Sequence, residues 1–289
     1  AASIPVNANC ASSRICSLSR EAGEGKGGGQ PFMSVSLETR DLTIRFGGHV
    51  AVDHVSCTFR PGELTAIVGP NGAGKTTYFN LISGQLRASE GQVLLDGVDI
   101  TAESAPLRAR RGLGRAFQLT NLFPNLTVAE NVRLAVQAKA GVHYDMLRPW
   151  SLRRELIARA DEILRDVALE NRRAHTAAAL SHGDQRKLEV ALMMALEPRV
   201  FMFDEPTAGM SVDEAPIVLD LIARLKQDRS KIILLVEHKM DVVRSLADRI
   251  IVLTNGACVA DGEPAAVIAS PVVQEAYLGV APKDKGAAA

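Results

Sequence analysis

The sequence predicts an α/β fold: a core with a parallel sheet, an N-terminal antiparallel β subdomain and an inserted α-helical subdomain. Short apolar runs separated by helical patterns are typical of parallel strands that are buried on both faces. These runs are 64–68, 200–203, 232–236 and 250–253. Two longer β-type segments, 36–46 and 50–60, come before them. Helical periodicity dominates about 106–196 and predicts the insertion.

The first 32 residues differ from the rest of the chain. They are rich in Gly, Ser and Ala, and residues 21–29 read Glu-Ala-Gly-Glu-Gly-Lys-Gly-Gly-Gly. Such a stretch cannot bury enough apolar area to offset its ordering entropy, so 1–32 is predicted to be a disordered tail. Met33 opens the patterned sequence, and we interpret it as the natural start. One domain is expected over 33–285, with its core at about 33–105 and 197–285 and the helical insertion at about 106–196.

Composition narrows the class of protein. The formal net charge is zero, which gives no electrostatic reason to expect nucleic acid as a partner. No apolar run approaches the ~18–20 residues of a membrane-spanning helix, so any link to a membrane is expected to run through a partner. The absence of a C-x-x-C pair favours free thiols over a disulfide or a zinc site. The four cysteines are Cys10, Cys16, Cys57 and Cys258.

Capping residues predict where two of the helices begin. Thr127 and Glu130 have the spacing of a capping box, in which each side chain satisfies a free backbone N–H of the other residue. Ser211 and Glu214 repeat that spacing. Helices are expected over 75–83, 127–140, 151–168, 181–196 and 212–227.

The strongest chemical signal is a glycine-rich stretch between a predicted strand and a predicted helix. It reads Gly69-Pro70-Asn71-Gly72-Ala73-Gly74-Lys75-Thr76-Thr77. This fits G-x-x-x-x-G-K-[ST], whose backbone N–H groups and helix N-terminus cradle phosphates. Lys75 is expected to reach the β- and γ-phosphates of ATP, and the Thr76 hydroxyl to ligate Mg²⁺. The core is therefore predicted to be a P-loop NTPase (RecA-like) core.

Two carboxylates follow another buried strand. Val200-Phe-Met-Phe203 is continued by Asp204 and Glu205. The carboxyl ends of parallel strands are where ligands bind in such sheets, so both residues are expected beside the phosphate loop. Asp204 is predicted to hold Mg²⁺, and Glu205 to polarise the attacking water as general base.

A third element, Leu180-Ser181-His182-Gly183-Asp184-Gln185, precedes a predicted helix. It resembles the Leu-Ser-Gly-Gly-Gln signature of the ABC ATPase family, with departures at His182 and Asp184. The resemblance covers about residues 34–283. It implies that Ser181 and Gly183 close over the nucleotide of a second ATPase subunit. That subunit would be a copy of this chain or a different ATPase.

The same resemblance assigns roles to three single residues. Gln118, in Arg115-Ala-Phe-Gln118, matches the glutamine that senses Mg²⁺ and contacts the transmembrane partner. His238 matches the histidine that touches the γ-phosphate, and Phe46 the aromatic residue that stacks on adenine. Ser211 stands where many family members have an aspartate that couples the two sites.

Within the family the chain looks most like the ATPases of branched-chain amino acid importers, and among these like the longer of the two ATPases. The resembling segments are 45–52, 114–119, 122–131 and 276–279. The resemblance implies two permease subunits, a periplasmic binding protein as an indirect partner, and a place on the cytoplasmic face of the inner membrane. Three alternatives stay open: a urea or amide importer, a lipopolysaccharide exporter, and a soluble ABC ATPase that does not transport.

Two groups of arginines also invite interpretation. They are Arg108, Arg110, Arg111 and Arg115, and then Arg148, Arg153 and Arg154. We interpret each group as a solvated face. The alternative is contact with a permease loop or with lipid headgroups.

Overall fold

The computed structural model describes residues 35–116, 122–141, 153–271, 273 and 274. The strands are β1 (Leu37–Phe46), β2 (His49–Phe59), β3 (Leu64–Val68), β4 (Glu90–Leu95), β5 (Val98–Asp99), β6 (Leu113–Ala116), β7 (Val200–Asp204), β8 (Ile232–Val236), β9 (Arg249–Thr254) and β10 (Ala257–Gly262). The helices are α1 (Lys75–Ser83), α2 (Ala105–Arg110), α3 (Val128–Lys139), α4 (Arg154–Asp166), α5 (His182–Leu196), α6 (Ala215–Gln227), α7 (Met240–Leu246) and α8 (Pro264–Ala269).

The central sheet has the strand order β10-β9-β3-β8-β7-β6. All of its neighbours pair in parallel except β10 and β9, which are antiparallel. Strands β3, β7 and β8 are buried along their whole length, as the apolar runs predicted. Because these three strands are adjacent and parallel, the loops that follow them meet at one edge of the sheet.

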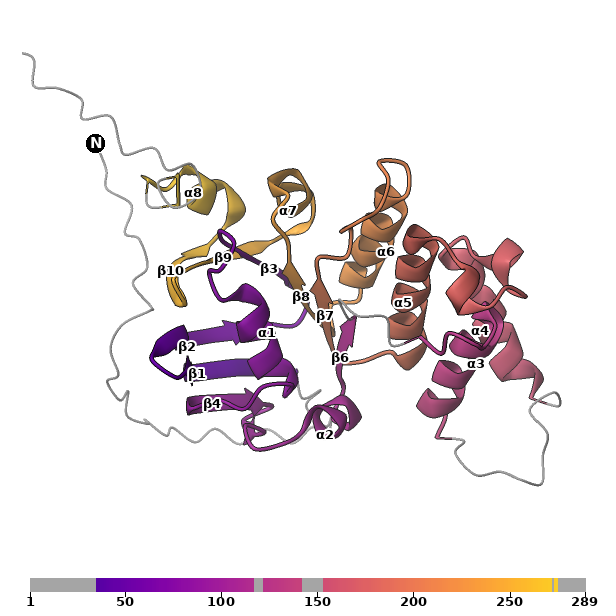
Figure 1. Ribbon diagram of the computed structural model, residues 1–289, viewed down its shortest axis with the longest axis horizontal. Coiled ribbons are helices and arrows are strands. Elements are labelled where there is room, and N and C mark those ends of the chain that lie inside the picture. Colours follow the sequence, from indigo (N-terminus) through magenta and orange to yellow (C-terminus); the bar gives the residue numbers. More distant parts are fainter. Residues whose placement is uncertain (1–34, 117–121, 142–152, 272, 275–289) are drawn as a thin grey trace, which may run out of the picture.

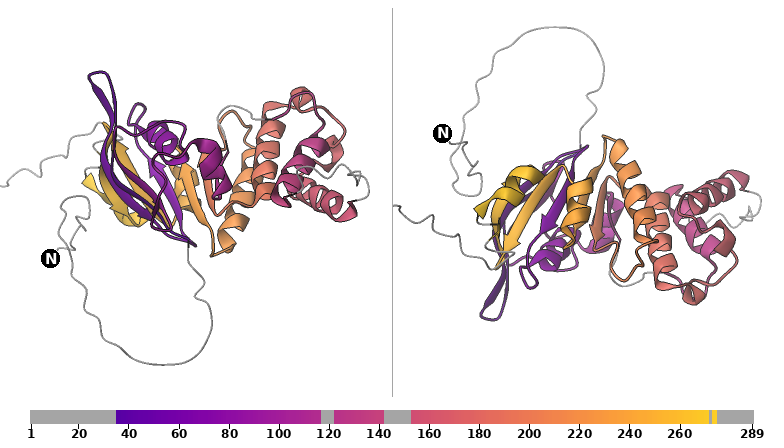
Figure 2. Two further views of the ribbon diagram at one scale, coloured as in Figure 1. Left: turned by 90° about the horizontal axis from the view of Figure 1, so that it is seen from below. Right: turned by 90° about the horizontal axis from the view of Figure 1, so that it is seen from above.

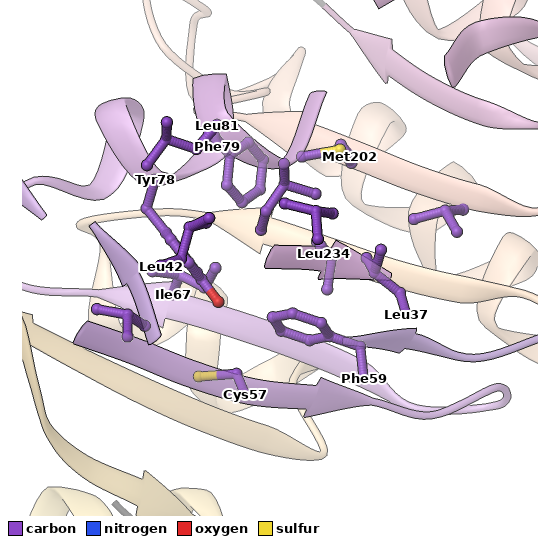
Figure 3. Packing of buried hydrophobic residues seen from close by; sticks show 14 of the residues in the cluster. Leu37, Leu42, Cys57, Phe59, Ile67, Tyr78, Phe79, Leu81, Met202 and Leu234 are labelled. Atoms are coloured by element: carbon purple, nitrogen blue, oxygen red, sulfur yellow. The ribbon is translucent and has the colours of Figure 1, made fainter. Parts of the chain in front are cut away.

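The second sheet is antiparallel, with the order β2-β1-β4-β5, which confirms the predicted β subdomain. Its inner face and helix α1 share one apolar cluster with the central sheet. Figure 3 shows Leu37 and Phe59 from the antiparallel sheet packed with Phe79 of α1 and Leu234 of β8. This packing fixes α1, and with it the phosphate loop, between the two sheets.

Helices α3, α4 and α5 gather at the end of the molecule away from β1 and β2 (Figure 1), and the views in Figure 2 show the same separation. They share a second apolar cluster that includes Val132, Ile163 and Leu188. The predicted capping box begins α3: Thr127 Oγ1 accepts from the Glu130 N–H, and the Thr127 N–H donates to Glu130 Oε2.

Two predicted boundaries differ from the structure. The range 106–196 was expected to be helical insertion, yet Leu113–Ala116 forms edge strand β6 of the central sheet, paired with β7. This strand is four residues long and contains an arginine, so it lacks the apolar run that marks the other core strands. The helix expected over 212–227 begins instead at Ala215. Ser211 and Glu214 do bond reciprocally, but they form a turn before Pro216, a residue suited to a first helical turn.

The interpretation of the first arginine group as a solvated face is wrong for two of its members. Arg108 is buried and donates to the carbonyl oxygens of Leu81 and Ile82, which lie in the last turn of helix α1. Arg115 is buried beside Asp204. A buried guanidinium needs several acceptors at once, and only the folded chain brings them together.

Several predictions fall outside the described residues: the tail 1–32, Cys10, Cys16, Gln118, Arg148 and the segment 276–279. Cys57 and Cys258 both keep their thiols, as predicted. Within the described ranges, none of the helices combines the length and the apolar character needed to cross a membrane.

Candidate functional site

The phosphate loop follows β3 and has a backbone that only glycine fits at two points. Gly69 has φ 152° and Gly74 has φ 94°. A Cβ at Gly69 would collide with the carbonyl oxygen of Leu253, and one at Gly74 with that of Ala51. These close approaches let the loop wind tightly into α1. A Cβ at Gly72 would meet open space, so no collision requires glycine there. The requirement comes from its positive φ of 80°, which other residues rarely adopt.

The first backbone N–H groups of helix α1 are not capped by a side chain of the described residues. Gly74 is its N-cap, and its first turn contains no acid. These N–H groups and the positive end of the helix dipole therefore suit an anion. The half-buried Thr76 and Thr77 lie in this first turn. A nucleotide phosphate fits this cradle.

Lys75 is buried and turned back over the loop, where its Nζ donates to the carbonyl oxygens of Gly69 (2.7 Å) and Pro70 (2.9 Å). Burial lowers the pKa of this ammonium, while the nearby carboxylates of Glu205 and Asp204 oppose that shift. The structure thus brings the predicted lysine and both predicted acids into one electrostatic neighbourhood.

Asp204 ends β7 with its side chain fully buried. Its Oδ2 accepts from Arg115 Nη2 at 2.7 Å, whereas Oδ1 has no hydrogen-bond partner among the described residues. A buried carboxylate oxygen without a partner is costly. Mg²⁺ and its bound waters are suitable partners for such an oxygen, so the donor set fits the metal that the phosphate loop implies.

Glu205 lies one residue beyond β7 in the left-handed region, at φ 49°. Its N–H donates to the carbonyl oxygen of Val236 at 3.0 Å, which fixes it to the end of β8. His238 follows β8, and its Nδ1 lies 3.7 Å from Glu205 Oε1. Both side chains keep access to solvent, with 28% and 50% of their surface exposed. A water molecule can therefore reach both.

Glu237 is a residue that the sequence analysis did not single out. It is buried and accepts hydrogen bonds from Thr207 Oγ1 (2.8 Å) and from the backbone N–H of His238 (3.0 Å). It thereby ties the loop after Glu205 to the loop that carries His238. A carboxylate after an apolar run was visible in the sequence, but its partners were not.

The signature segment starts α5, with Ser181 as N-cap accepting from the Asp184 N–H at 3.1 Å. Ser181 and His182 are exposed. The His182 ring lies against Gly209, where an added Cβ would come within 3.0 Å of it. Gly183 faces the carboxylate of Glu214 so closely that a side chain there would collide with it. The signature is thus packed on the loop that follows Glu205.

Helix α5 lies with α3 and α4, apart from α1, in Figures 1 and 2. Ser181 and Gly183 therefore belong to the start of a helix that is separate from the helix of the phosphate loop. Phe46 is 50% exposed at the end of β1, where a flat ligand could lie against it.

An apolar cleft of about 380 Å³ opens between β6, α3 and α5. Phe123 and Leu196 contribute to it and remain 56% and 42% exposed. Leu134 and Leu192 also line it. Arg115, Asn131 and Glu189 are polar residues in its lining.

Comparisons with known proteins agree with this geometry. The family described as ABC transporter matches residues 52–208. The branched-chain amino acid transport ATP-binding protein LivG of Escherichia coli K12 is 38% identical over 87% of this chain and 99% of its own. BraF of Pseudomonas aeruginosa, with the same description, is 37% identical over 85% of this chain and 98% of its own.

Solved structures give the same answer. A nucleotide-free ATP-binding cassette from an ABC transporter superposes with a TM-score of 0.72 and 28% identity, over 85% of this chain and 100% of that one. A dimeric cassette bound to ADP and Pi superposes with a TM-score of 0.68 and 28% identity, over 79% of this chain and 98% of that one. The chain therefore belongs to the ABC transporter family and is one of its ATP-hydrolysing cassettes.

Proposed function

We propose that this chain is the ATPase of an importer for branched-chain or related amino acids, and that it hydrolyses Mg²⁺-bound ATP at the edge of the central sheet. The observation that carries the ATP site is the convergence there of an uncapped helix N-terminus, Lys75, and the paired acids Asp204 and Glu205. The cargo class is supported by the likeness to LivG and BraF, which extends over nearly their whole length.

Each residue has a defined task in this proposal. The backbone N–H groups of the loop 69–77, apart from Pro70, and the ammonium of Lys75 bind the phosphates, and Phe46 stacks on the base. The Thr76 hydroxyl and Asp204, with Gln118, hold Mg²⁺, which when bound neutralises charge on the phosphate oxygens. Glu205 accepts the proton of the attacking water, and His238 contacts the γ-phosphate.

A second ATPase subunit completes the site. Ser181 and Gly183 start α5, a helix separate from α1, and Ser181 and His182 are exposed there whereas Gly183 is buried. A helix start is suited to covering the phosphates of a facing subunit, which would exclude water and strengthen the electrostatic interactions inside. The dimeric form of the similar cassette supports this arrangement.

The apolar cleft is the proposed docking site for a cytoplasmic helix of a permease. Exposed, contiguous apolar surface marks a binding site for another protein, and a groove between helices suits an amphipathic helix. A chain docked in this way would lie on the cytoplasmic face of the inner membrane. The variants Phe123→Asp and Leu196→Asp should abolish co-purification with the permeases while leaving the nucleotide site intact. Val98→Asp, at an exposed apolar residue on β5 of the antiparallel sheet, is the matched control.

The deciding experiment is uptake. Membrane vesicles carrying the co-purified permeases and this chain should accumulate labelled leucine, isoleucine or valine in the presence of binding protein and ATP. Accumulation of urea instead, outward movement of lipopolysaccharide, or the failure of any membrane protein to co-purify with the chain would contradict the amino acid assignment and identify the alternative.

A further inference from the structure

Arg115 connects the Asp204 carboxylate to the helix that follows the phosphate loop. Its Nη2 donates to Asp204 Oδ2 at 2.7 Å. Its Nη1 donates to Asn80 Oδ1 (2.6 Å), Ser83 Oγ (3.0 Å) and Gln85 Oε1 (3.1 Å), which belong to α1 and the turn after it. The side chain is 6% exposed.

An aromatic ring adds a further contact to the guanidinium. Its central carbon lies 5.6 Å from the centre of the Phe79 ring, a cation–π distance. A planar fork fixed by several acceptors cannot follow a carboxylate that turns, so it imposes one orientation on Asp204. A lysine could not make the same set of contacts from a single ammonium.

The consequence is that the two oxygens of Asp204 have different surroundings. Oδ2 is engaged by Arg115, while Oδ1 is buried without a hydrogen-bond partner in the described part of the chain. The ion pair with Arg115 thus leaves Oδ1 available to another ligand. An outer residue that orients a metal ligand in this way typically contributes about 10–100-fold to metal affinity.

We propose that Arg115 is a positioning residue for the nucleotide-bound Mg²⁺, holding Asp204 so that Oδ1 is available to the metal or to one of its waters. This inference rests on the proposed role of Asp204 in binding Mg²⁺. The guanidinium also repels the metal, but it engages Oδ2 of the carboxylate and not Oδ1.

The test measures binding rather than turnover. Isothermal titration of the full chain with ADP, in excess Mg²⁺ and again in EDTA, gives the factor by which Mg²⁺ tightens ADP binding. Arg115→Met should reduce this factor about tenfold and leave the affinity in EDTA unchanged, because the phosphate loop is untouched. Arg115→Lys keeps the positive charge and so disturbs the fold less. Its factor should lie between those of Arg115→Met and the wild type.

Two further variants separate the possible failures. Arg108→Met removes another buried arginine that braces α1 without touching Asp204, so it should keep the wild-type factor despite a lower melting temperature. Asp204→Asn should lose the factor. If Asp204→Asn loses it but both Arg115 variants keep it, Arg115 is merely structural and the inference fails. The inference also fails if Arg108→Met loses the factor too, or if Arg115→Met binds Mg²⁺ more tightly. If Asp204→Asn also keeps it, the proposed metal site itself is wrong.

Discussion

His238 Nδ1 lies 3.7 Å from Glu205 Oε1, although the two residues follow different strands of the central sheet. Strands β7 and β8 are paired in register from Val200 opposite Ile232 to Asp204 opposite Val236, so the residues after their ends are neighbours. The hydrogen bond from the Glu205 N–H to Val236 fixes the spacing. The proposed general base and the histidine proposed to contact the γ-phosphate are thereby placed at one edge of the central sheet.

Glu205→Gln should bind ATP with Mg²⁺ as the wild type does but lower the hydrolysis rate by about 10²–10⁴-fold, because the amide cannot accept the proton of the water. The variant should also persist as an ATP-bound dimer, which size-exclusion chromatography would detect. Wild-type turnover in this variant would exclude Glu205 as the base. His238→Ala tests the neighbour: it should slow hydrolysis and leave ADP affinity unchanged.

Lys75→Ala should lower hydrolysis by at least about 10²-fold and weaken nucleotide binding, since a charge-assisted contact to the phosphates is lost. The lysine also braces the loop through the carbonyls of Gly69 and Pro70, so the loop should become more mobile in the variant. Nucleotide titration and amide hydrogen exchange over 69–77 measure the two effects. Undiminished hydrolysis would refute the site assignment.

Mixing two inactive variants tests the composite site. Ser181→Arg keeps its own phosphate loop but blocks the partner's nucleotide, whereas Lys75→Ala keeps the signature but not the loop. If the chain pairs with itself, the mixture contains one intact site per mixed dimer and should recover part of the wild-type ATPase activity. If its partner is a different ATPase, recovery will require that protein. Full activity of strictly monomeric Ser181→Arg protein would defeat the idea.

The pH dependence of stability should show the cost of burying Glu189 in the cleft wall. Burial raises the pKa of this carboxyl above its ordinary value of 4.5, against the pull of Arg186. A raised pKa contributes stability below pH 4.5 that is lost as pH rises through the folded-state pKa. Glu189→Gln should remove this loss, so its unfolding free energy should fall less than that of the wild type between pH 4.5 and 7.

A matched control for this measurement is Glu162, which makes the same i,i+3 pair with Arg159 at 2.7 Å but is exposed. The Arg159 hydrogen bond lowers the pKa of Glu162, so its contribution has the opposite sign: it is present above pH 4.5 and is lost as pH falls through the lowered pKa. Glu162→Gln should therefore leave the loss at rising pH in place. Urea denaturation across this pH range distinguishes the two variants. If the unfolding free energy of both variants changed with pH in the same way, the assignment to Glu189 would be contradicted.

The sequence alone determined the parts of this protein whose signal is local. The apolar runs gave the central strands β3, β7, β8 and β9, because buried parallel strands must be apolar on both faces. The glycine spacing before Lys75 located the phosphate loop, because the backbone needs positive φ at those points. The Thr127 and Glu130 spacing located the start of α3, because both halves of a capping box lie within four residues.

Only the tertiary structure decided features that depend on distant segments. Strand β6 has no apolar run and exists because β7 offers it a parallel partner. The burial of Arg108 and Arg115 depends on acceptors supplied by α1 and β7, which no pattern around the arginines contains. The unpartnered Oδ1 of Asp204 is likewise a result of that packing among the described residues. Composition and periodicity indicate which residues are buried away from water. The partner of a buried charge depends instead on which distant chain segments pack together in the folded protein.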